Sequence, residues 1–151
     1  MAFYQTVNFT KLTSWAQTPT RGSEQAAGYD LYADAENQDR IVLAPGEVKK
    51  ISTGIAIELP EGTFGAIYAR SGLATKKGLA PCNKVGVIDS DYRGPIIVAL
   101  KNESDKLQII EHGERIAQIV VQPYIPVFFN EVPAIGTTIR GEHGFGSTGS
   151  K

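Results

Sequence analysis

Short segments rich in β-branched and aromatic residues recur along the whole chain, and turn-forming residues separate them. The segments are TVNFT, IVLA, VKKIST, IAIEL, FGAIYA, PIIVAL, LQII, IAQIVVQPYI and VFFNEV. Turn signals follow several of them, for example at Pro45-Gly46, Pro60 to Gly62 and Asn102 to Asp105. No stretch keeps a helical apolar period over three turns, and SGLATKKG is predicted to form one helical turn at most. The pattern predicts an all-β sandwich or barrel-like domain and argues against a parallel α/β nucleotide-binding sheet.

The length and the charge of the chain narrow its class further. A chain of 151 residues suits one domain with its own core. Its 15 Lys and Arg residues nearly balance its 16 Asp and Glu residues, and no basic run stands out. We therefore expect no nucleic-acid partner, because binding to that backbone needs many cationic side chains along one face. Any anionic ligand is expected to be small and held by a local cluster.

The chain carries no recognisable targeting or membrane signal. The N-terminus MAFYQTVNFTKL has no basic stretch leading into an apolar run, and no segment reaches the apolar length that spans a bilayer. The single cysteine, Cys82, cannot form an intrachain disulfide, and it is expected to be a buried small hydrophobe rather than a reactive thiol. We expect a cytoplasmic protein with no membrane partner, or a nuclear one if the chain is eukaryotic or viral.

The chain ends in the glycine-rich sequence RGEHGFGSTGSK. Its glycines allow close approach of backbone N–H groups to an anion, and Ser147 and Thr148 add hydroxyl donors. Arg140 adds a bidentate guanidinium, and Phe145 adds an aromatic face that could stack on a base. The lysine of a Walker loop is missing, and too few residues remain to form the helix that follows one. From the residues alone, a phosphate-binding tail and an unstructured terminus are equal alternatives.

A second candidate anion site is the sequence ARSGLATKKG. Arg70, Ser71 and Gly72 follow a predicted strand and place a charged fork and a backbone donor together. The alternative is a solvated surface turn, in which Arg-Ser-Gly is common.

A third candidate is the sequence CNKVGVIDSDYRG. The apolar run Val85 to Ile88 leads into Asp89, and alternation along a strand would place Asp89 and Asp91 on one face if the chain stays extended. A carboxylate at the mouth of a hairpin can orient and deprotonate a water molecule. It can equally cap a turn, which is the commoner role of a lone aspartate.

Five sequence motifs together resemble one known family. They are AAGYDL (26–31), RSGLA (70–74), GVIDSDYRG (86–94), RIAQIV (115–120) and RGEHGFGSTG (140–149). In order and spacing these are similar to the motifs of the trimeric deoxyuridine triphosphatases (dUTPases), and they cover almost the whole chain. The resemblance implies a jelly-roll-like β-barrel (β-clip) over residues 1–139 and a flexible C-terminal arm over residues 140–151. It also implies a homotrimer with exchanged arms, in which each active site draws on all three chains.

The resemblance implies hydrolysis of dUTP to dUMP and pyrophosphate by attack of water on the α-phosphorus. This reaction keeps uracil out of DNA and supplies dUMP for thymidylate synthesis. Asp89 is the implied catalytic general base. The implied cofactor is Mg²⁺, which phosphate oxygens and water chelate, so that no side chain is a direct ligand and Asp30 contacts the ion through water.

The resemblance also assigns a substrate-binding set. Its members are Arg70, Ser71, Gly72, Asn83, Gly86, Val87, Ile88, Asp89, Tyr92, Gln118, Arg140, Phe145, Gly146, Ser147 and Thr148. The hairpin over residues 83–89 would pair with uracil, and Tyr92 would pack beneath the deoxyribose and exclude a 2′-hydroxyl. The arginines, Gln118, the RSG turn and the tail would hold the phosphates, while Phe145 would stack on the uracil as the arm closes.

Two positions depart from the family pattern, and two other functions stay open. His143 stands where relatives often have a small residue, and Ile97 stands where many have a lysine. Arg115 is expected to be a structural ion-pair partner, and VFFNEV (127–132) is expected in the core or a subunit interface.

The alternative functions are a dCTP deaminase-like enzyme of the same fold and a catalytically silent nucleotide-binding protein. The Asp89–Tyr92 hairpin and the complete tail argue against the deaminase.

Overall fold

Antiparallel β-strands account for nearly all regular structure, as the sequence pattern predicted. The computed structural model describes residues 5–35 and 40–144. The strands are β1 (Asn8–Lys11), β2 (Thr20–Arg21), β3 (Tyr29–Tyr32), β4 (Arg40–Leu43), β5 (Val48–Ser52), β6 (Ile55–Glu58), β7 (Thr63–Tyr68), β8 (Leu79–Pro81), β9 (Gly86–Ile88), β10 (Ile97–Asn102), β11 (Gln108–Glu111) and β12 (Arg115–Pro123); the helix in these ranges is α1 (Ser71–Lys77). No helix in the described ranges is long and apolar enough to cross a membrane.

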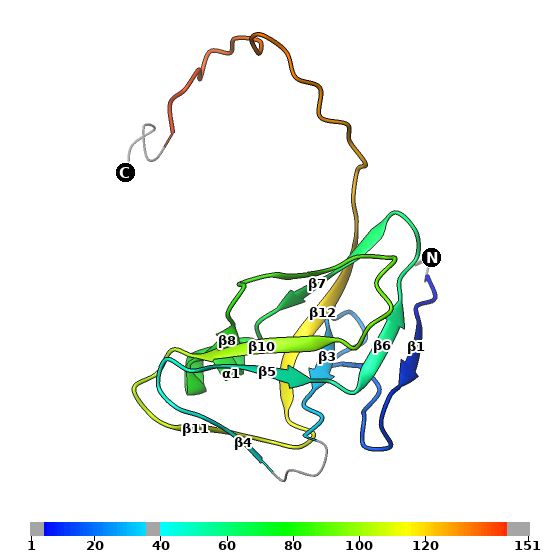
Figure 1. Cartoon of the computed structure of the whole chain (residues 1–151), viewed down its shortest axis with the longest axis vertical. Helices are drawn as coiled ribbons and strands as arrows, with labels where there is room; N and C mark the ends of the chain where they lie inside the picture. The colour runs from blue at the N-terminus through cyan, green and yellow to red at the C-terminus, as the bar shows by residue number, and fades with distance from the viewer. Residues whose placement is uncertain (1–4, 36–39, 145–151) are drawn as a thin grey trace.

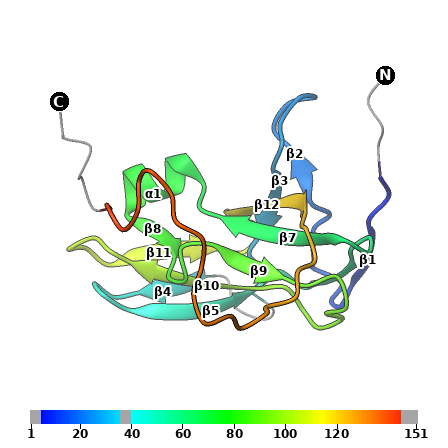
Figure 2. The ribbon, with the colours of Figure 1, turned by 90° about the horizontal axis from the view of Figure 1, so that it is seen from above.

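The strands form two facing layers around one core (Figure 2). One layer is a five-stranded sheet in the order β2-β3-β12-β7-β9, and the other contains the three-stranded sheet β5-β10-β8. The two-stranded ribbons β1-β6 and β11-β4 complete a jelly-roll-like barrel (Figure 1). The largest fully buried side chains come from both layers and the ribbons: Leu31, Leu43, Ile51, Ile55, Leu79, Ile96, Leu100, Ile110 and Ile116.

β10 shows how the sequence produces this arrangement. Its residues alternate between buried and more exposed positions, with Val98, Leu100 and Asn102 facing inward. A period of two is the signature of a strand that buries one face. The strand is therefore fixed between β5 and β8 with its apolar side toward the core.

The helix α1 is longer than predicted. It covers seven residues, whereas the sequence pattern predicted one turn at most. Gly78 ends it in the left-handed conformation (φ 65°) and donates its N–H to the Ala74 carbonyl. Lys77 then anchors the last turn, because its Nζ lies 2.6 Å from Glu114 Oε1 and 3.1 Å from the Ile109 carbonyl. Tertiary contacts that are invisible in the local sequence thus extend the helix.

The strand expected at VFFNEV and the burial expected for Cys82 were wrong. VFFNEV forms no strand, and Val127, Phe128 and Phe129 are exposed rather than in the core, on a segment that leaves the barrel after β12 (Figures 1 and 2). The other place expected for this segment, a subunit interface, stays a prediction. Cys82 is half-buried rather than buried, because it lies in the turn that follows β8.

A buried asparagine joins three segments of the barrel. The side-chain amide of Asn102 donates to the Leu43 carbonyl (3.0 Å) and to the Lys106 carbonyl (2.7 Å). Its Oδ1 accepts hydrogen bonds from the N–H and the hydroxyl of Ser104. All the polar atoms of this fully buried side chain are therefore paired.

We expect Asn102→Ala to lower the free energy of unfolding by about 3 kcal/mol, because two carbonyls in the barrel lose their donor. The midpoint of urea unfolding measures the change. Ser104→Ala is the matched control and should cost less than about 1.5 kcal/mol, since the Asn102 amide keeps both carbonyls. An Asn102→Ala variant as stable as the unmodified protein would contradict this role.

Candidate active site

The phosphate-binding candidates meet where β3, β12 and β7 lie side by side. Gln118 of β12 is paired with Asp30 of β3 on one side and with Tyr68 of β7 on the other. Arg70 follows β7 in an extended conformation, immediately before α1. The Gln118 amide donates to the Ala69 carbonyl at 2.9 Å and so holds the end of β7. The fold therefore brings Asp30, Arg70 and Gln118 together, with Ser71 and Gly72 next along the chain.

Asp30 anchors two arginines at this place. Its Oδ1 accepts a hydrogen bond from Arg70 Nε at 2.7 Å, and its Oδ2 lies 3.4 Å from Arg70 Nη2 and 3.3 Å from Arg115 Nη1. The carboxylate is largely buried, whereas the Arg70 and Arg115 side chains are 30% and 50% exposed. One negative and two positive charges leave a net positive charge at the surface, which suits an anion. The expected ion pair of Arg115 is present.

Sequence reasoning missed one residue of this cluster, Gly28. A β-carbon at this position would collide with the Gln118 side chain, so only glycine leaves room for the observed Gln118 conformation. The sequence signal for Gly28 was its place in the AAGYDL motif, but only the fold shows that Gln118 lies against it.

The second group of predicted residues lies on the hairpin that ends in β9. β9 pairs with β7 and forms the edge of the five-stranded sheet. Gly86 packs closely against Ile67, because a β-carbon there would lie 3.1 Å from Ile67 Cβ. Asn83 and Val85 close the preceding turn through a 2.7 Å backbone hydrogen bond. The backbone of Gly86, Val87 and Ile88 is thus held on one side and open on the other.

Lys84 connects this hairpin to the residue after β10 through an exposed ion pair, and its own backbone conformation is unusual. It has a positive φ of 66°, which is uncommon for a residue with a side chain. Its Nζ lies 2.8 Å from Oε1 of Glu103, the residue that follows β10. This hydrogen bond and charge, with a smaller contribution from Lys101, lower the pKa of Glu103. Since the pKa of Glu103 is lowered, the stabilisation from the Lys84–Glu103 ion pair is fully present above the ordinary pKa of a glutamate. It is lost as the pH falls through the pKa of Glu103 in the folded protein.

Asp89 and Tyr92 are the first and last residues of one tight turn. The Tyr92 N–H donates to the Asp89 carbonyl at 3.1 Å. The extended chain that would place Asp89 and Asp91 on one face of a strand is therefore not present, because the chain turns at Ser90 and Asp91. The Tyr92 ring lies directly against Gly94, where a β-carbon would collide with it, and its hydroxyl donates to the Pro95 carbonyl.

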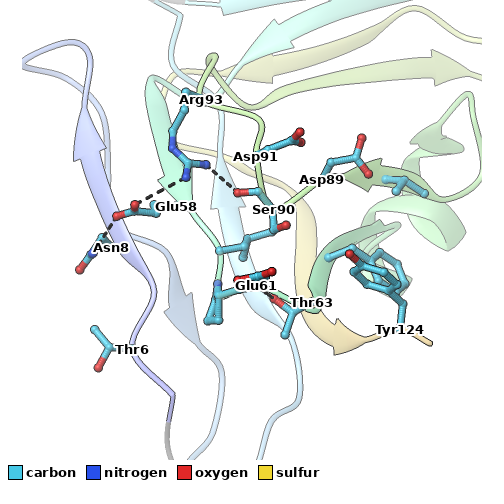
Figure 3. A pocket seen from close by; sticks show the side chains of 14 residues that line it. Thr6, Asn8, Glu58, Glu61, Thr63, Asp89, Ser90, Asp91, Arg93 and Tyr124 are labelled. Carbon is cyan, nitrogen blue, oxygen red and sulfur yellow. Dashed lines mark hydrogen bonds and ion pairs between the residues drawn. The ribbon is translucent and has the colours of Figure 1, made fainter. Parts of the chain in front are cut away.

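An open pocket of about 1160 Å³ adjoins this turn, with Asp89, Ser90 and Asp91 on its wall (Figure 3). The rest of its lining comes from β1, β6, the loop between β6 and β7, β7 and β9, together with Thr6, Arg93 and Tyr124. Arg70, Ser71, Gly72 and Gln118 are not among the residues that line it. The pocket therefore adjoins the Asp89 turn and not the Arg70 cluster.

The two groups lie at opposite ends of β7. The register pairs Ile88 with Gly65, so Asp89 lies beside Phe64, near the start of β7. Arg70 comes six residues later, just beyond the end of the strand. At the usual rise of a β-strand this separates the two backbones by about 20 Å. One chain therefore does not bring Asp89 to Arg70.

The tail residues are only partly described. Arg140 lies on the segment that leaves the barrel, where its Nε donates to the His143 carbonyl (2.9 Å). Its expected place at the phosphates is thus not occupied within this chain. Phe145, Gly146, Ser147 and Thr148 lie outside the described residues.

Comparison with known proteins gives a consistent answer. The family model dUTPase matches residues 15–149. A deoxyuridine 5′-triphosphate nucleotidohydrolase of Hydrogenobaculum sp. is 49% identical over 93% of this chain and 96% of its own length. A mutant dUTPase of Staphylococcus bacteriophage 80alpha, solved with dUpNHpp, has a TM-score of 0.86 at 29% identity and covers 97% of this chain and 99% of its own. A mutant dUTPase from phage phi11 of S. aureus, described for its coordination of a structural Mg(II) ion, shares the fold at 24% identity (TM-score 0.78; 88% of this chain and 100% of its own).

The family match spans most of the chain, and the relative from Hydrogenobaculum is matched over nearly its full length. The five sequence motifs and the barrel agree with this match. The chain belongs to the dUTPase family.

Proposed function

We propose that this chain hydrolyses dUTP to dUMP and pyrophosphate, and thereby limits dUTP and supplies dUMP. The observation that carries the proposal is the Asp89–Tyr92 turn, which places an exposed carboxylate next to an edge strand with open backbone groups. In a member of this family, that pair of features suits water activation beside a bound nucleotide. The related phage enzyme solved with dUpNHpp supports the choice of substrate.

The hairpin is suited to recognise the base. As the edge of its sheet, β9 uses one side of its backbone to pair with β7. The N–H and C=O groups on the other side can pair with the polar edge of uracil. Rigid backbone groups discriminate well, because a base with the wrong donor and acceptor pattern leaves them unpaired.

The cluster around Arg70 is suited to hold the triphosphate. Asp30 fixes the Arg70 guanidinium, so the remaining N–H groups can face a phosphate without first losing side-chain freedom. Ser71, Gly72 and Gln118 lie beside it and would add neutral donors. In this proposal Asp30 contributes chiefly as the anchor of Arg70.

We propose that each site combines residues of different subunits in a homotrimer. Two observations support this: Asp89 and Arg70 of one chain are about 20 Å apart along β7, and the segment after β12 exposes Phe128, Phe129 and Ile139 to solvent. Exposed apolar side chains of this size are typical of protein interfaces. The barrel (1–139) would supply the two halves of the site, and the arm (140–151), with Arg140, Phe145, Gly146, Ser147 and Thr148, would close over a neighbouring site.

Mg²⁺ would accompany the substrate. Among the described residues, no three His, Cys, Asp or Glu side chains converge as a metal site. A cation bound mainly by triphosphate oxygens and water needs no such cage, which fits the chemistry of Mg²⁺. Both oxygens of Asp30 already contact arginines, so contact with the ion would be through water. When bound, the ion would neutralise charge on the phosphates.

Pyrophosphate release from dUTP, dTTP, dCTP and UTP in the presence of Mg²⁺ tests the proposed function. We expect selective turnover of dUTP. Ammonia release from dCTP would instead identify a deaminase of the same fold. Tight binding of dUTP without turnover of any nucleotide would identify a silent binding protein.

We expect Gly94→Ala to weaken the discrimination between dUTP and UTP. The added methyl group collides with the Tyr92 ring, which must move from the position where it would exclude a 2′-hydroxyl. The ratio of kcat/KM for dUTP over UTP should fall by about tenfold, since steric exclusion of one small group is worth this much or more. Gly22→Ala is the control, because a β-carbon there meets no atom within 4 Å. An unchanged ratio in Gly94→Ala would contradict the role of Tyr92.

A further inference from the structure

We propose that Arg93 is a positioning residue that fixes the Asp89–Tyr92 turn to the β1–β6 ribbon through Glu58. The inference rests on the proposed function, because it assigns Asp89 to catalysis and Tyr92 to the sugar. It adds two residues, Arg93 and Glu58, whose side chains the proposed function does not use.

The Arg93 guanidinium closes the turn from outside. Its Nη1 donates to the Ser90 carbonyl at 2.6 Å and to the Tyr92 carbonyl at 3.2 Å. These carbonyls belong to the second and fourth residues of the turn that begins at Asp89. One planar group thus sets the relative orientation of two peptide units, one between Asp89 and Tyr92 and one directly after Tyr92.

The same guanidinium connects the turn to a distant part of the chain. Arg93 Nη2 lies 3.5 Å from Glu58 Oε1 at the end of β6. Glu58 Oε2 accepts a 2.8 Å hydrogen bond from the side-chain amide of Asn8, its register partner on β1 (Figure 3). Glu58 is therefore held from both sides, and it can serve as a fixed point for the turn.

The contact is better suited to positioning than to stability. The Arg93 and Glu58 side chains are 55% and 53% exposed, and exposed ion pairs contribute little to the stability of a fold. A tight turn without this clamp can rotate locally while the barrel stays folded. Asp89 and Tyr92 would then both move, and displacements of about 1 Å can cost as much as a hundredfold in rate.

Four variants test the inference. Arg93→Ala removes the clamp, and we expect kcat for dUTP to fall by about tenfold to a hundredfold with an unchanged melting temperature. Arg93→Lys keeps the charge but cannot bind both carbonyls and Glu58 as a planar fork, so its kcat should lie in between. Glu58→Gln keeps an acceptor for Asn8 and removes only the ion pair with Arg93, so its kcat should fall less than that of Arg93→Ala. The double variant Arg93→Ala with Glu58→Gln should be no worse than Arg93→Ala alone.

The selectivity for dUTP over UTP separates positioning from general damage. If Arg93 positions Tyr92, Arg93→Ala should lower this selectivity. If Arg93 only stabilised the fold, the molecules of Arg93→Ala that remain folded would keep the selectivity unchanged. Arg40→Ala is the matched control, because it removes the same exposed charge from the ribbon β4–β11 and should change neither quantity.

The outcomes distinguish this inference from the proposed function. If the unmodified protein does not hydrolyse dUTP, the proposed function fails. If it does, and Arg93→Ala keeps the full kcat and selectivity, only the role of Arg93 fails. A loss of kcat that Arg40→Ala reproduces would also overturn the role of Arg93. Should Arg93→Ala fold poorly, Arg93→Lys and Glu58→Gln give the same test through kcat and selectivity.

Discussion

Replacement of Asp89 by asparagine is expected to lower kcat for dUTP by about a hundredfold to ten-thousandfold, with little change in KM. Asparagine keeps the size of the side chain and can still hold a water molecule, but it cannot accept a proton. Binding should persist, since the Arg70 cluster lies at the other end of β7 and does not contact Asp89. Steady-state pyrophosphate release measures the loss of kcat, and calorimetric titration with dUpNHpp measures whether binding persists.

Asp91→Asn is the matched control for this experiment. Asp91 is an exposed carboxylate of the same turn and lines the same pocket. Its replacement removes the same charge, and we expect kcat to stay within about threefold, as for a residue that takes no part in proton transfer. Equal losses in both variants would show that charge alone matters. An unchanged kcat in Asp89→Asn would remove Asp89 from catalysis.

The strands that the sequence predicted are those with a clear apolar pattern. β7, β10 and β12 lie at the centre of their sheets, and their long apolar or alternating runs were recognised. β2, β3 and β8 were missed, because TR, YDLY and LAP contain no run of β-branched residues, and their pairing partners decide their conformation. The VFFNEV segment has strand-like composition, but it pairs with no strand in the part of the chain that the structure describes. Composition favours an extended conformation, but pairing depends on the available partners.

The chemistry of the site was easier to predict than its arrangement. The motifs identified Asp89, Arg70 and Gln118 by type and order. The sequence could not show that Asp30 fixes Arg70, because that contact depends on the register of β3, β12 and β7. Nor could it show the reversal at Ser90, which separates Asp89 from Asp91. Most importantly, only the pairing of β9 with β7 reveals that Asp89 and Arg70 lie far apart.

This separation leads to a second large expected effect, the recovery of activity in mixed oligomers. Asp89→Asn and Arg70→Ala should each be nearly inactive alone, because each lacks one half of every site. If a site takes Asp89 from one subunit and Arg70 from another, a mixed trimer contains sites in which both residues are intact. Random assembly of equal amounts should restore about one quarter of the unmodified activity, which follows from the symmetry of a closed ring.

The two variants must be unfolded together and refolded, so that their subunits can exchange. Simple mixing of the folded variants is the control, and it should show no recovery while the trimers stay intact. A second control mixes the Asp89→Asn variant with a double variant that carries both Asp89→Asn and Arg70→Ala. This mixture should also stay inactive, because no subunit then supplies Asp89. Recovery of about one quarter would support sites shared between subunits. No recovery after refolding would mean that each chain completes its own site, which would require Asp89 or Arg70 to move about 20 Å along β7 from its present place.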